Sequence, residues 1–563
     1  MCGIYITNLD LNKDAVLNKI NKIKFRGPDN TGFSNIDQVI IAHLRLAIID
    51  LDKRSNQPYY YDGLYLTYNG EIYNYKEIRS QLIASGYKFE TTSDTEVILK
   101  SYHKWGKKML DYFNGMFAFS IYDSKQKLIF SARDRLGVKP FYYSFNNGKF
   151  EISSQLSPID NNNYTINTNA ISAYLRTGYI PSPLSVYNEI KKLSPGTYMI
   201  IDLKENKLTI NKYWHLKKIK ETKITYDEAK SKLEELLTDS VKIRLNSDVK
   251  IGTFLSGGID SALITSIASK ISNKKINTFT VGYDEPKYDE SKLAKKYSDI
   301  LDTNHKEFLC KSSDLLNLVP NLINVYDEPF ADSSAIPSMY LNKKAKSDVT
   351  VVLSGDGGDE SFFGYNHFFI SNLVHIVFLI PYKIRKFFFN FLPMRIISLI
   401  VRKEYWVLKE IFLLKNIRDY IKRIFISQPR YLKKNKLDWF KYYKSVFDLS
   451  NNIFQNIADL NIKLWLENDS NVKVDRSSMA YSVEVRSPFL DYRIIEFARS
   501  IPQKYRYSSR RRKKILRDIL KKYIPEKLFH APKKGFSVPI KEWSRDILKN
   551  EITKKLNKKN LRK

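Results

Sequence analysis

Two apolar segments of this chain each run into a glycine-rich turn and then a helical pattern, and this repeated unit constrains the fold most strongly. The first segment, Ile251 to Leu255, precedes SGGIDS, and the second, Val349 to Leu353, precedes SGDGGDE. A strand that enters a helix through a glycine turn, repeated in one chain, predicts a doubly wound α/β domain. The functional site of such a domain is expected at the carboxyl ends of its strands.

The chain before about Asp202 has a different pattern. Alternating stretches such as LYLTYNGEIYNY, together with a buried-looking FAFSIYD, predict a strand-rich domain. A helical pattern begins near Tyr226, and the change of pattern lies near Trp214. We therefore expect two domains, residues 1–210 and residues 211–563.

Composition narrows the class of protein. With 563 residues, 43% of them apolar, the chain can build two or three hydrophobic cores and is not expected to be disordered. The net charge of +33 reflects 93 lysine and arginine residues against 60 acidic ones, and because lysine is abundant along the whole chain, a solvated basic surface is favoured over specific nucleic-acid binding. Only Cys2 and Cys310 are cysteines, and no leader pattern follows Met1, so a reducing, cytoplasmic setting is expected.

The most apolar region runs from Leu373 to Val401 and is interrupted by Pro381 and by several basic residues. A spanning helix needs about 20 uninterrupted apolar residues. Packed helices are therefore predicted here, with a peripheral membrane contact of this basic, aromatic region after Tyr365 as the alternative.

The start Met1-Cys2-Gly3 allows removal of the initiator methionine, which leaves Cys2 with a free α-amine. This amine, with a pKa of about 7.7 to 8.0, can accept the proton of a thiol whose pKa is about 8.5, so one residue supplies both nucleophile and base. Taken alone, a second-position cysteine is more often a buried structural thiol. Six further segments follow in order: RGPDNTG, AHLRLAIID, YNGEIYN, SDTEVIL, NGMFAFSIYD and ARDRLGVKPFYY.

In this order the segments closely resemble class II glutamine amidotransferases, which are N-terminal-nucleophile hydrolases, and among them the asparagine synthetase B family. The resemblance implies an αββα sandwich and a glutaminase activity at Cys2. It assigns oxyanion stabilisation to Asn69 and Gly70, for which a side-chain amide and a backbone N–H are suitable donors. Taken alone, NGE would predict only a turn between strands. The resemblance places glutamine against Arg45, Leu46, Ala47, Ile48, Ile49, Asn69, Gly70, Glu71 and Asp94.

The segment SGGIDS predicts a phosphate-binding turn at a helix N-terminus, without the lysine of a Walker motif. Such loops are typical of ATP pyrophosphatases, so the second domain is expected to be a doubly wound synthetase domain with helical additions. The residues of this loop expected at ATP are Ser256, Gly257, Gly258, Asp260 and Ser261, and the resemblance adds Leu255, Val281, Ser354 and Gly355. Asp260, at the end of the loop, is an expected Mg²⁺ ligand, and the resemblance gives Asp359, beside Glu360, a related role.

Two later segments, Asp475 to Asp491 and Ala531 to Ile540, also resemble the asparagine synthetase B family. By this resemblance Lys533 stabilises negative charge during adenylation, although a lysine in so basic a chain is more often a surface residue. Arg486 and Asp491 are alternatively expected to form a buried ion pair.

The sequence departs from the family in ways that bear on the acceptor. Asp356 lies where the family commonly has glutamate, the acid linked to acyl-adenylate formation and to the ammonia step, and its side chain is one methylene shorter. ESFFG after Asp359 differs from the usual ELFGGY, and Gln155 and Ala531 replace a frequent glutamate and arginine.

The favoured reaction is glutamine-dependent synthesis of asparagine, in which the β-carboxylate of aspartate attacks ATP and ammonia then displaces AMP. The same chemistry on a sugar uronate of a surface-polysaccharide pathway is the first alternative. A tRNA-modifying ATP pyrophosphatase and a scaffold without catalysis are the others. Glutamine, ATP and aspartate or another carboxylate are the expected partners, and a homodimer is left open.

Overall fold

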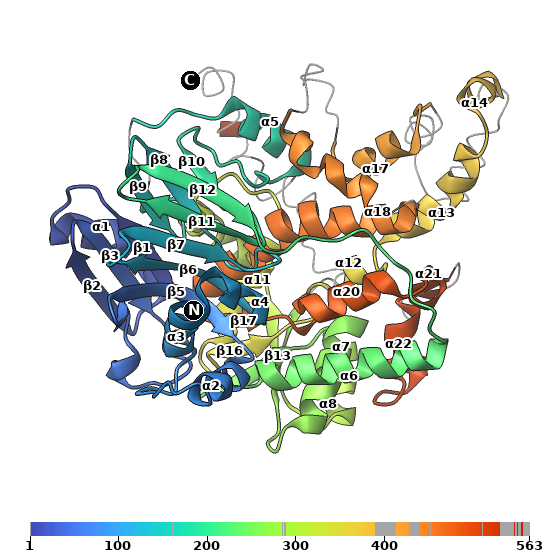
Figure 1. Ribbon diagram of the computed structural model, residues 1–563. Helices are drawn as coiled ribbons and strands as arrows, with labels where there is room; N and C mark the ends of the chain where they lie inside the picture. The colour runs from blue at the N-terminus through green and yellow to red at the C-terminus, as the bar shows by residue number, and fades with distance from the viewer. Residues whose placement is uncertain are drawn as a thin grey trace.

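The computed structural model describes residues 2–159, 163–283, 285, 289–388, 413–427, 438–450, 452–508, 511–529 and four single residues, 545, 549, 553 and 554. Lys533 and Ala531 lie outside the described residues, as does the part of the apolar region beyond residue 388. Figure 1 shows a two-layered β region built from the N-terminal part of the chain, beside an α/β region built from the later part.

The N-terminal region contains two six-stranded antiparallel sheets. The first has the order β10 (Ile190–Lys192), β8 (Tyr142–Asn146), β9 (Lys149–Ser153), β1 (Gly3–Thr7), β3 (Val39–Arg45) and β2 (Asn30–Ile36). The second has the order β12 (Lys207–Lys212), β11 (Thr197–Asp202), β7 (Leu128–Arg133), β6 (Gly115–Asp123), β5 (Leu64–Ile72) and β4 (Tyr59–Tyr61).

Side chains alternate between the two faces of β1, as the period of a strand requires. Ile4 and Ile6 pack with Ala118 and Ile129 of the second sheet, so they form the core between the sheets. Tyr5 faces the opposite way and packs on α1 (Lys13–Asn21). The second sheet is covered by α2 (Tyr75–Ile83), α3 (Asp94–Trp105) and α4 (Met109–Tyr112). The predicted αββα sandwich is confirmed.

The C-terminal region is built on a five-stranded parallel sheet with the order β15 (Asn304–Cys310), β14 (Asn277–Tyr283), β13 (Ile251–Phe254), β16 (Val351–Leu353) and β17 (Glu484–Arg486). One face packs on α6 (Tyr226–Arg244), α7 (Ile259–Ile271), α8 (Ser291–Ile300), α20 (Tyr492–Ser500) and α22 (Lys514–Leu520). The other packs on α9 (Ser312–Leu316), α10 (Leu322–Tyr326), α11 (Ala335–Ala345) and α19 (Asn471–Met479). Helices on both faces of a parallel sheet confirm the doubly wound prediction.

Helical additions surround this core. An aromatic cluster joins α5 (Thr168–Thr177), α13 (Asn366–Phe378), α17 (Ile417–Phe425) and α18 (Ile453–Leu460). Figure 1 shows α13 and α14 (Tyr382–Phe388) projecting from the body of the molecule. In the described part of the chain, no helix is long and apolar enough to cross a membrane. A short helix, α21 (Gln503–Arg506), precedes the β18 (Tyr507–Ser508) and β19 (Arg511–Arg512) hairpin.

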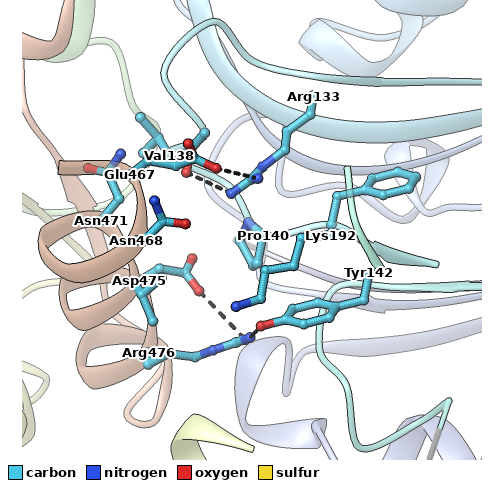
Figure 2. A pocket seen from close by; sticks show the side chains of 13 residues that line it. Arg133, Val138, Pro140, Tyr142, Lys192, Glu467, Asn468, Asn471, Asp475 and Arg476 are labelled. Atoms are coloured by element: carbon cyan, nitrogen blue, oxygen red, sulfur yellow. Dashed lines mark hydrogen bonds and ion pairs between the residues drawn. The ribbon is translucent and has the colours of Figure 1, made fainter. Parts of the chain in front are cut away.

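A π-helical segment, Asn461–Ser470, joins α18 to α19 in one continuous helical run. Such wider turns are rare and occur often at functional sites. This run carries Glu467, Asn468, Asp475 and Arg476 to the boundary between the two regions (Figure 2).

Candidate active site

Cys2 lies buried immediately before β1, the strand that occupies the interior of the first sheet. Its backbone nitrogen donates to Asn69 Oδ1 at 3.0 Å. The same nitrogen becomes the α-amine when Met1 is removed. Burial raises the pKa of the Cys2 thiol, while the amino-terminal charge, the Leu46 N–H and Arg45 each lower it. A backbone donor and the Arg45 guanidinium therefore oppose the burial that would keep the thiol protonated.

Asn69 and Gly70 lie on β5, against Cys2. The Asn69 side-chain oxygen accepts from Cys2, whereas its buried Nδ2 has no hydrogen-bond partner among the described residues. Gly70 has φ +152°, and a Cβ there would lie 2.1 Å from the Met116 carbonyl oxygen on β6. Only glycine fits this approach of β5 to β6. The structure thus brings an unused amide donor to the nucleophile, and Gly70 follows Asn69 directly in β5.

Arg45 ends β3, and its guanidinium holds the loop that follows. Nη1 donates to Asp52 O and Asn56 Oδ1, both at 2.8 Å, and Nη2 donates to Asp50 O. The predicted glutamine-site residues between Arg45 and this loop are mostly buried: Leu46, Ile48 and Ile49, with Ala47 half-buried. A guanidinium has five donor hydrogens, so three of them fix the loop and two remain for a ligand.

Asp94 begins α3 and lies under the end of β5. Its Oδ2 accepts from Tyr68 OH at 2.8 Å and from the Ile72 N–H at 2.9 Å. Burial raises the pKa of Asp94 to about 6, although both hydrogen bonds oppose the rise. The carboxylate is therefore ionised near neutral pH and available for a cationic group.

Glu71 contacts the C-terminal region. Arg486 of β17 approaches Glu71 Oε1 at 3.2 Å and binds Glu484 Oε1 at 2.6 Å. Burial raises the pKa of Glu71, and the Arg486 charge opposes that rise. The alternative expectation of an Arg486–Asp491 ion pair is wrong, because Asp491 instead binds Arg244 and Arg493 at 3.3 and 2.8 Å. Arg486 points toward the glutaminase half, whereas Asp491 caps α20.

A second contact across the boundary was not predicted. Arg26 Nε donates to the Cys2 carbonyl oxygen at 3.2 Å, and its two terminal nitrogens donate to Asp475 at 2.8 and 3.0 Å. Gln155 accepts from Arg26 and donates to Asp327 at 2.8 Å. A glutamate at residue 155 could not donate this bond when ionised. Arg26 lies in RGPDNTG, but its partner is 449 residues away, so only the resemblance marked the segment.

The SGGIDS loop is held by its own hydroxyl groups. Ser261 Oγ accepts from the Ser256 N–H and lies 2.9 Å from Ser256 Oγ, which accepts from the Gly258 N–H. Gly258 starts α7 without a side-chain cap. The first N–H groups of α7 thus form an anion-binding end.

The SGDG turn after β16 lies against the SGGIDS turn after β13, at the carboxyl ends of the two strands. A Cβ on Gly355 would lie 2.7 Å from the Ser261 nitrogen, so a side chain there would separate the two turns. Leu255 is buried directly after β13, and Val281 is buried within β14. The predicted nucleotide residues from both turns are therefore in one place.

Asp260 and Asp359 also come together here. Lys513 Nζ binds Asp260 Oδ2 and lies 2.5 Å from Asp359 Oδ1. A cation already bridges the two carboxylates, so they fit a divalent ion that enters with phosphates; Mg²⁺ is usually held by one or two carboxylates plus substrate oxygens. Among the described residues, no cluster of three or more acidic, His or Cys side chains offers a metal cage. Glu360 instead accepts from Tyr365 at 2.6 Å, and burial raises its pKa to about 7.

Asp356 lies at the boundary of the two regions. Its Oδ2 accepts from Ser354 Oγ at 2.8 Å. It lines a cavity of about 10 Å³ together with Lys139 and Asp475, beside the apolar side chains of Val138, Val474, Val485 and Leu490. This cavity therefore connects the region of the Arg26–Asp475 pair with the predicted synthetase acid.

Two further cavities, of about 20 Å³ each, are also lined by Val138, which lines the cavity at Asp356 as well. Figure 2 shows one of them, in which Arg133 faces Glu467, and Arg476 lies between Asp475 and Tyr142. A cavity of about 10–15 Å³ holds one water molecule. Each space is therefore suited to a molecule of the size of water or ammonia.

Comparison with known proteins matches both halves of the chain. The family model described as "Asparagine synthase" matches residues 232–563, and the model "Glutamine amidotransferase domain" matches residues 1–214. A Methanocaldococcus jannaschii protein whose name includes "asparagine synthetase (glutamine-hydrolyzing) 2" is 40% identical over 399 residues, 65% of this chain and 76% of its own length. "Asparagine synthetase (glutamine-hydrolyzing) 1" of Bacillus subtilis is 31% identical over 96% of this chain and 86% of its own length. "Amidase chry2" of Gibberella zeae is 26% identical over 100% of this chain and 92% of its own length.

Proposed function

Because the chain belongs to the asparagine synthase family, we propose that it is a glutamine-dependent asparagine synthetase that uses ATP and, with it, Mg²⁺. One observation carries the proposal. A nucleophile with an unused amide donor beside it and a phosphate-binding turn with paired carboxylates occur in one chain, and the Arg26–Asp475 pair joins the two regions. We propose residues 1–210 as the glutaminase domain and residues 211–563 as the synthetase domain.

In the glutaminase half, the Cys2 thiol attacks the carbonyl carbon of the glutamine side-chain amide and its α-amine takes the proton. Asn69 Nδ2 and the Gly70 N–H stabilise the oxyanion, because both are fixed before the reaction begins. Arg45 binds the α-carboxylate with its remaining donors, and Asp94 binds the α-ammonium. Ammonia leaves, and water then releases glutamate from the thioester.

In the synthetase half, the β-carboxylate of aspartate attacks the α-phosphorus of ATP, and pyrophosphate leaves from the opposite side. The SGGIDS and SGDG turns bind phosphate oxygens through backbone N–H groups at the start of α7. Asp260 and Asp359 would hold Mg²⁺, which neutralises charge on the departing pyrophosphate when it is bound. Lys533, outside the described residues, keeps its expected role of balancing charge at the adenylate.

Ammonia then displaces AMP from the acyl-adenylate, and Asp356 accepts a proton from the attacking nitrogen. The shorter reach of Asp356 is compatible with this role because Ser354 fixes one of its oxygens at 2.8 Å, beside the small cavity. We propose that the three cavities around Val138 mark the path of ammonia between the halves. The lining is partly polar, so transfer here relies on enclosure rather than on an apolar wall alone.

The acceptor is tested by product analysis. Purified full-length protein is incubated with ATP, Mg²⁺ and glutamine, and separately with aspartate, glucuronate or galacturonate, and the products are identified by mass spectrometry. The proposal requires asparagine and AMP in the aspartate reaction. An amidated uronate with no asparagine would transfer the same chemistry to the alternative acceptor and overturn the proposed one.

A further inference from the structure

A buried lysine bridges the two carboxylates of the nucleotide site. Lys513 Nζ contacts both Asp260 and Asp359, the second at 2.5 Å, and the lysine is 5% exposed. We propose that Lys513 is a built-in counter-ion: its ammonium fills the space between Asp260 and Asp359 when nucleotide is absent and moves to the phosphates when nucleotide and metal enter together. This inference rests on the proposed ATP chemistry.

The backbone holds Lys513 in this place. The residue precedes α22 with φ +52° and ψ +38°, a left-handed conformation that is uncommon for lysine. Its carbonyl oxygen accepts the Arg517 N–H at 3.0 Å, so the first turn of α22 is built on this conformation. Backbone strain of this kind persists where the surrounding structure fixes it, often at functional sites.

Glycines surround the bridge and leave room for nothing larger. A Cβ on Gly364 would lie 1.8 Å from Asp359 Oδ1 and 2.2 Å from Lys513 Cε. A Cβ on Gly358 would lie 2.6 Å from Asp260 Oδ1. Both glycines therefore leave no room for a side chain beside the carboxylate–ammonium–carboxylate arrangement, and the ammonium contacts the carboxylate oxygens that a metal ion would need.

The charge of Lys513 affects how a metal ion binds to Asp260 and Asp359. Two buried carboxylates repel each other, and one ammonium between them reduces the local charge from −2 to −1. A divalent ion without nucleotide must displace the ammonium and leave it buried with no counter-charge, which is costly. Burial and the nearby Arg511 and Arg512 lower the pKa of Arg517 whereas Asp260 raises it, so this guanidinium is a further cation near the bridge. Phosphates supply the missing counter-charge, so metal alone binds weakly and metal with nucleotide binds well.

Mn²⁺ binding to the full-length protein without nucleotide tests the proposal, with free Mn²⁺ measured by electron paramagnetic resonance. Lys513→Met removes the ammonium but keeps an unbranched side chain. The Kd of this variant for Mn²⁺ should be at least about tenfold lower than that of the unchanged protein, because the ammonium no longer competes with Mn²⁺ for the paired carboxylates. Lys514→Met is the matched control, since Lys514 contacts Tyr226 instead and its loss should leave the Mn²⁺ Kd unchanged.

An unchanged Kd in Lys513→Met, or an equal fall in Lys514→Met, overturns the proposal. If Lys513→Met does not fold, Lys513→Gln takes its place with the same expectation, since a neutral amide carries no charge that competes with the metal ion. As a second readout, Mn²⁺ should raise the Tm of the Lys513 variant more than that of the unchanged protein. Neither measurement requires turnover. If Lys513→Met binds Mn²⁺ more tightly but the unchanged protein forms no asparagine, the proposed acceptor is wrong and the role of Lys513 stands.

Discussion

Arg26 and Asp475 form a bidentate ion pair across the boundary of the two catalytic regions, and the same guanidinium donates to the carbonyl oxygen of Cys2. The Arg26 side chain is fully buried, and Lys139 lies 3.9 Å from Asp475. The residue that follows Asp475 in α19, Arg476, lines an interdomain cavity. The position of the nucleophile is therefore tied to the helical run that borders the synthetase site.

Asp475→Asn should damage this connection, because it leaves the Arg26 guanidinium buried without its counter-charge. Loss of one partner of a buried pair costs about 3–5 kcal/mol of the free energy of unfolding. We also expect glutamine-dependent asparagine formation to fall further than ammonia-dependent formation, because the Cys2 carbonyl loses a fixed donor. Denaturant unfolding and the ratio of the two activities are the measurements.

Asp459→Asn is the matched control. Asp459 forms a comparable buried bidentate pair with Arg499, at 2.8 and 2.9 Å, wholly within the C-terminal region. It should lose similar stability and keep the ratio of the two activities. An equal change of that ratio in both variants would show that the Arg26–Asp475 pair has only a structural role.

Asn69→Ala should slow glutamine hydrolysis by about 10²–10³-fold in kcat, the cost of one oxyanion donor. Nδ2 has no partner among the described residues, but the substitution also removes Oδ1, which accepts from the Cys2 nitrogen at 3.0 Å. Ammonia-dependent synthesis should be retained in this variant and in Cys2→Ala, which should lose all use of glutamine. A glutaminase rate unchanged in Asn69→Ala would remove Asn69 from the oxyanion site.

The dependence of glutamine use on pH should follow Asp94. Burial raises the pKa of this carboxyl to about 6, so as the pH falls through 6 the group becomes neutral and loses its attraction for an α-ammonium. The value of kcat/KM for glutamine should therefore fall on the acid side of pH 6. Ammonia-dependent synthesis, expressed per unprotonated ammonia, should lack this limb.

Tyr68→Phe tests whether Asp94 is the group that controls the acid limb of glutamine use. Removal of the hydroxyl that donates to Asp94 should raise the pKa of the carboxyl and move the acid limb to higher pH. Tyr122→Phe, which removes a hydrogen bond to the exposed Asp37, serves as the control and should not move it. If both variants keep the limb at the same pH, another group controls glutamine binding.

Asp356→Asn should separate the two halves of the reaction. The amide keeps the size of the side chain and can still accept from Ser354, but it cannot take a proton from ammonia. Asparagine formation from either nitrogen source should fall by more than about 10²-fold, the usual contribution of a general base, while glutamine hydrolysis continues. Full synthesis in this variant would exclude Asp356 as the base.

The features predicted from the sequence are local ones. The strand, glycine turn and helix around SGGIDS follow from neighbouring residues, and the structure builds them as β13 and α7. The alternating stretch that forms β5 and the parallel sheet have the same origin, because strand period and glycine turns are read within a few residues. Resemblance supplied Asn69, Gly70 and Asp94, whose individual roles remain predictions.

Long-range pairs were not predictable from the sequence. Lys513 meets Asp260 across 253 residues, and Arg26 meets Asp475 across 449 residues. In a chain of net charge +33, no lysine stands out by composition. The expected Arg486–Asp491 pair failed for the same reason: spacing along the chain could not tell that Arg486 points to Glu71 across the domain boundary.

The central claim is that nitrogen from glutamine reaches a carboxylate activated by ATP at its α-phosphorus. The most direct test supplies aspartate labelled with ¹⁸O in its β-carboxylate and glutamine labelled with ¹⁵N in its amide, and analyses the products by mass spectrometry. The account predicts ¹⁵N in the side-chain amide of asparagine and one ¹⁸O in AMP. Label in inorganic phosphate, ADP in place of AMP, or no labelled asparagine would contradict it.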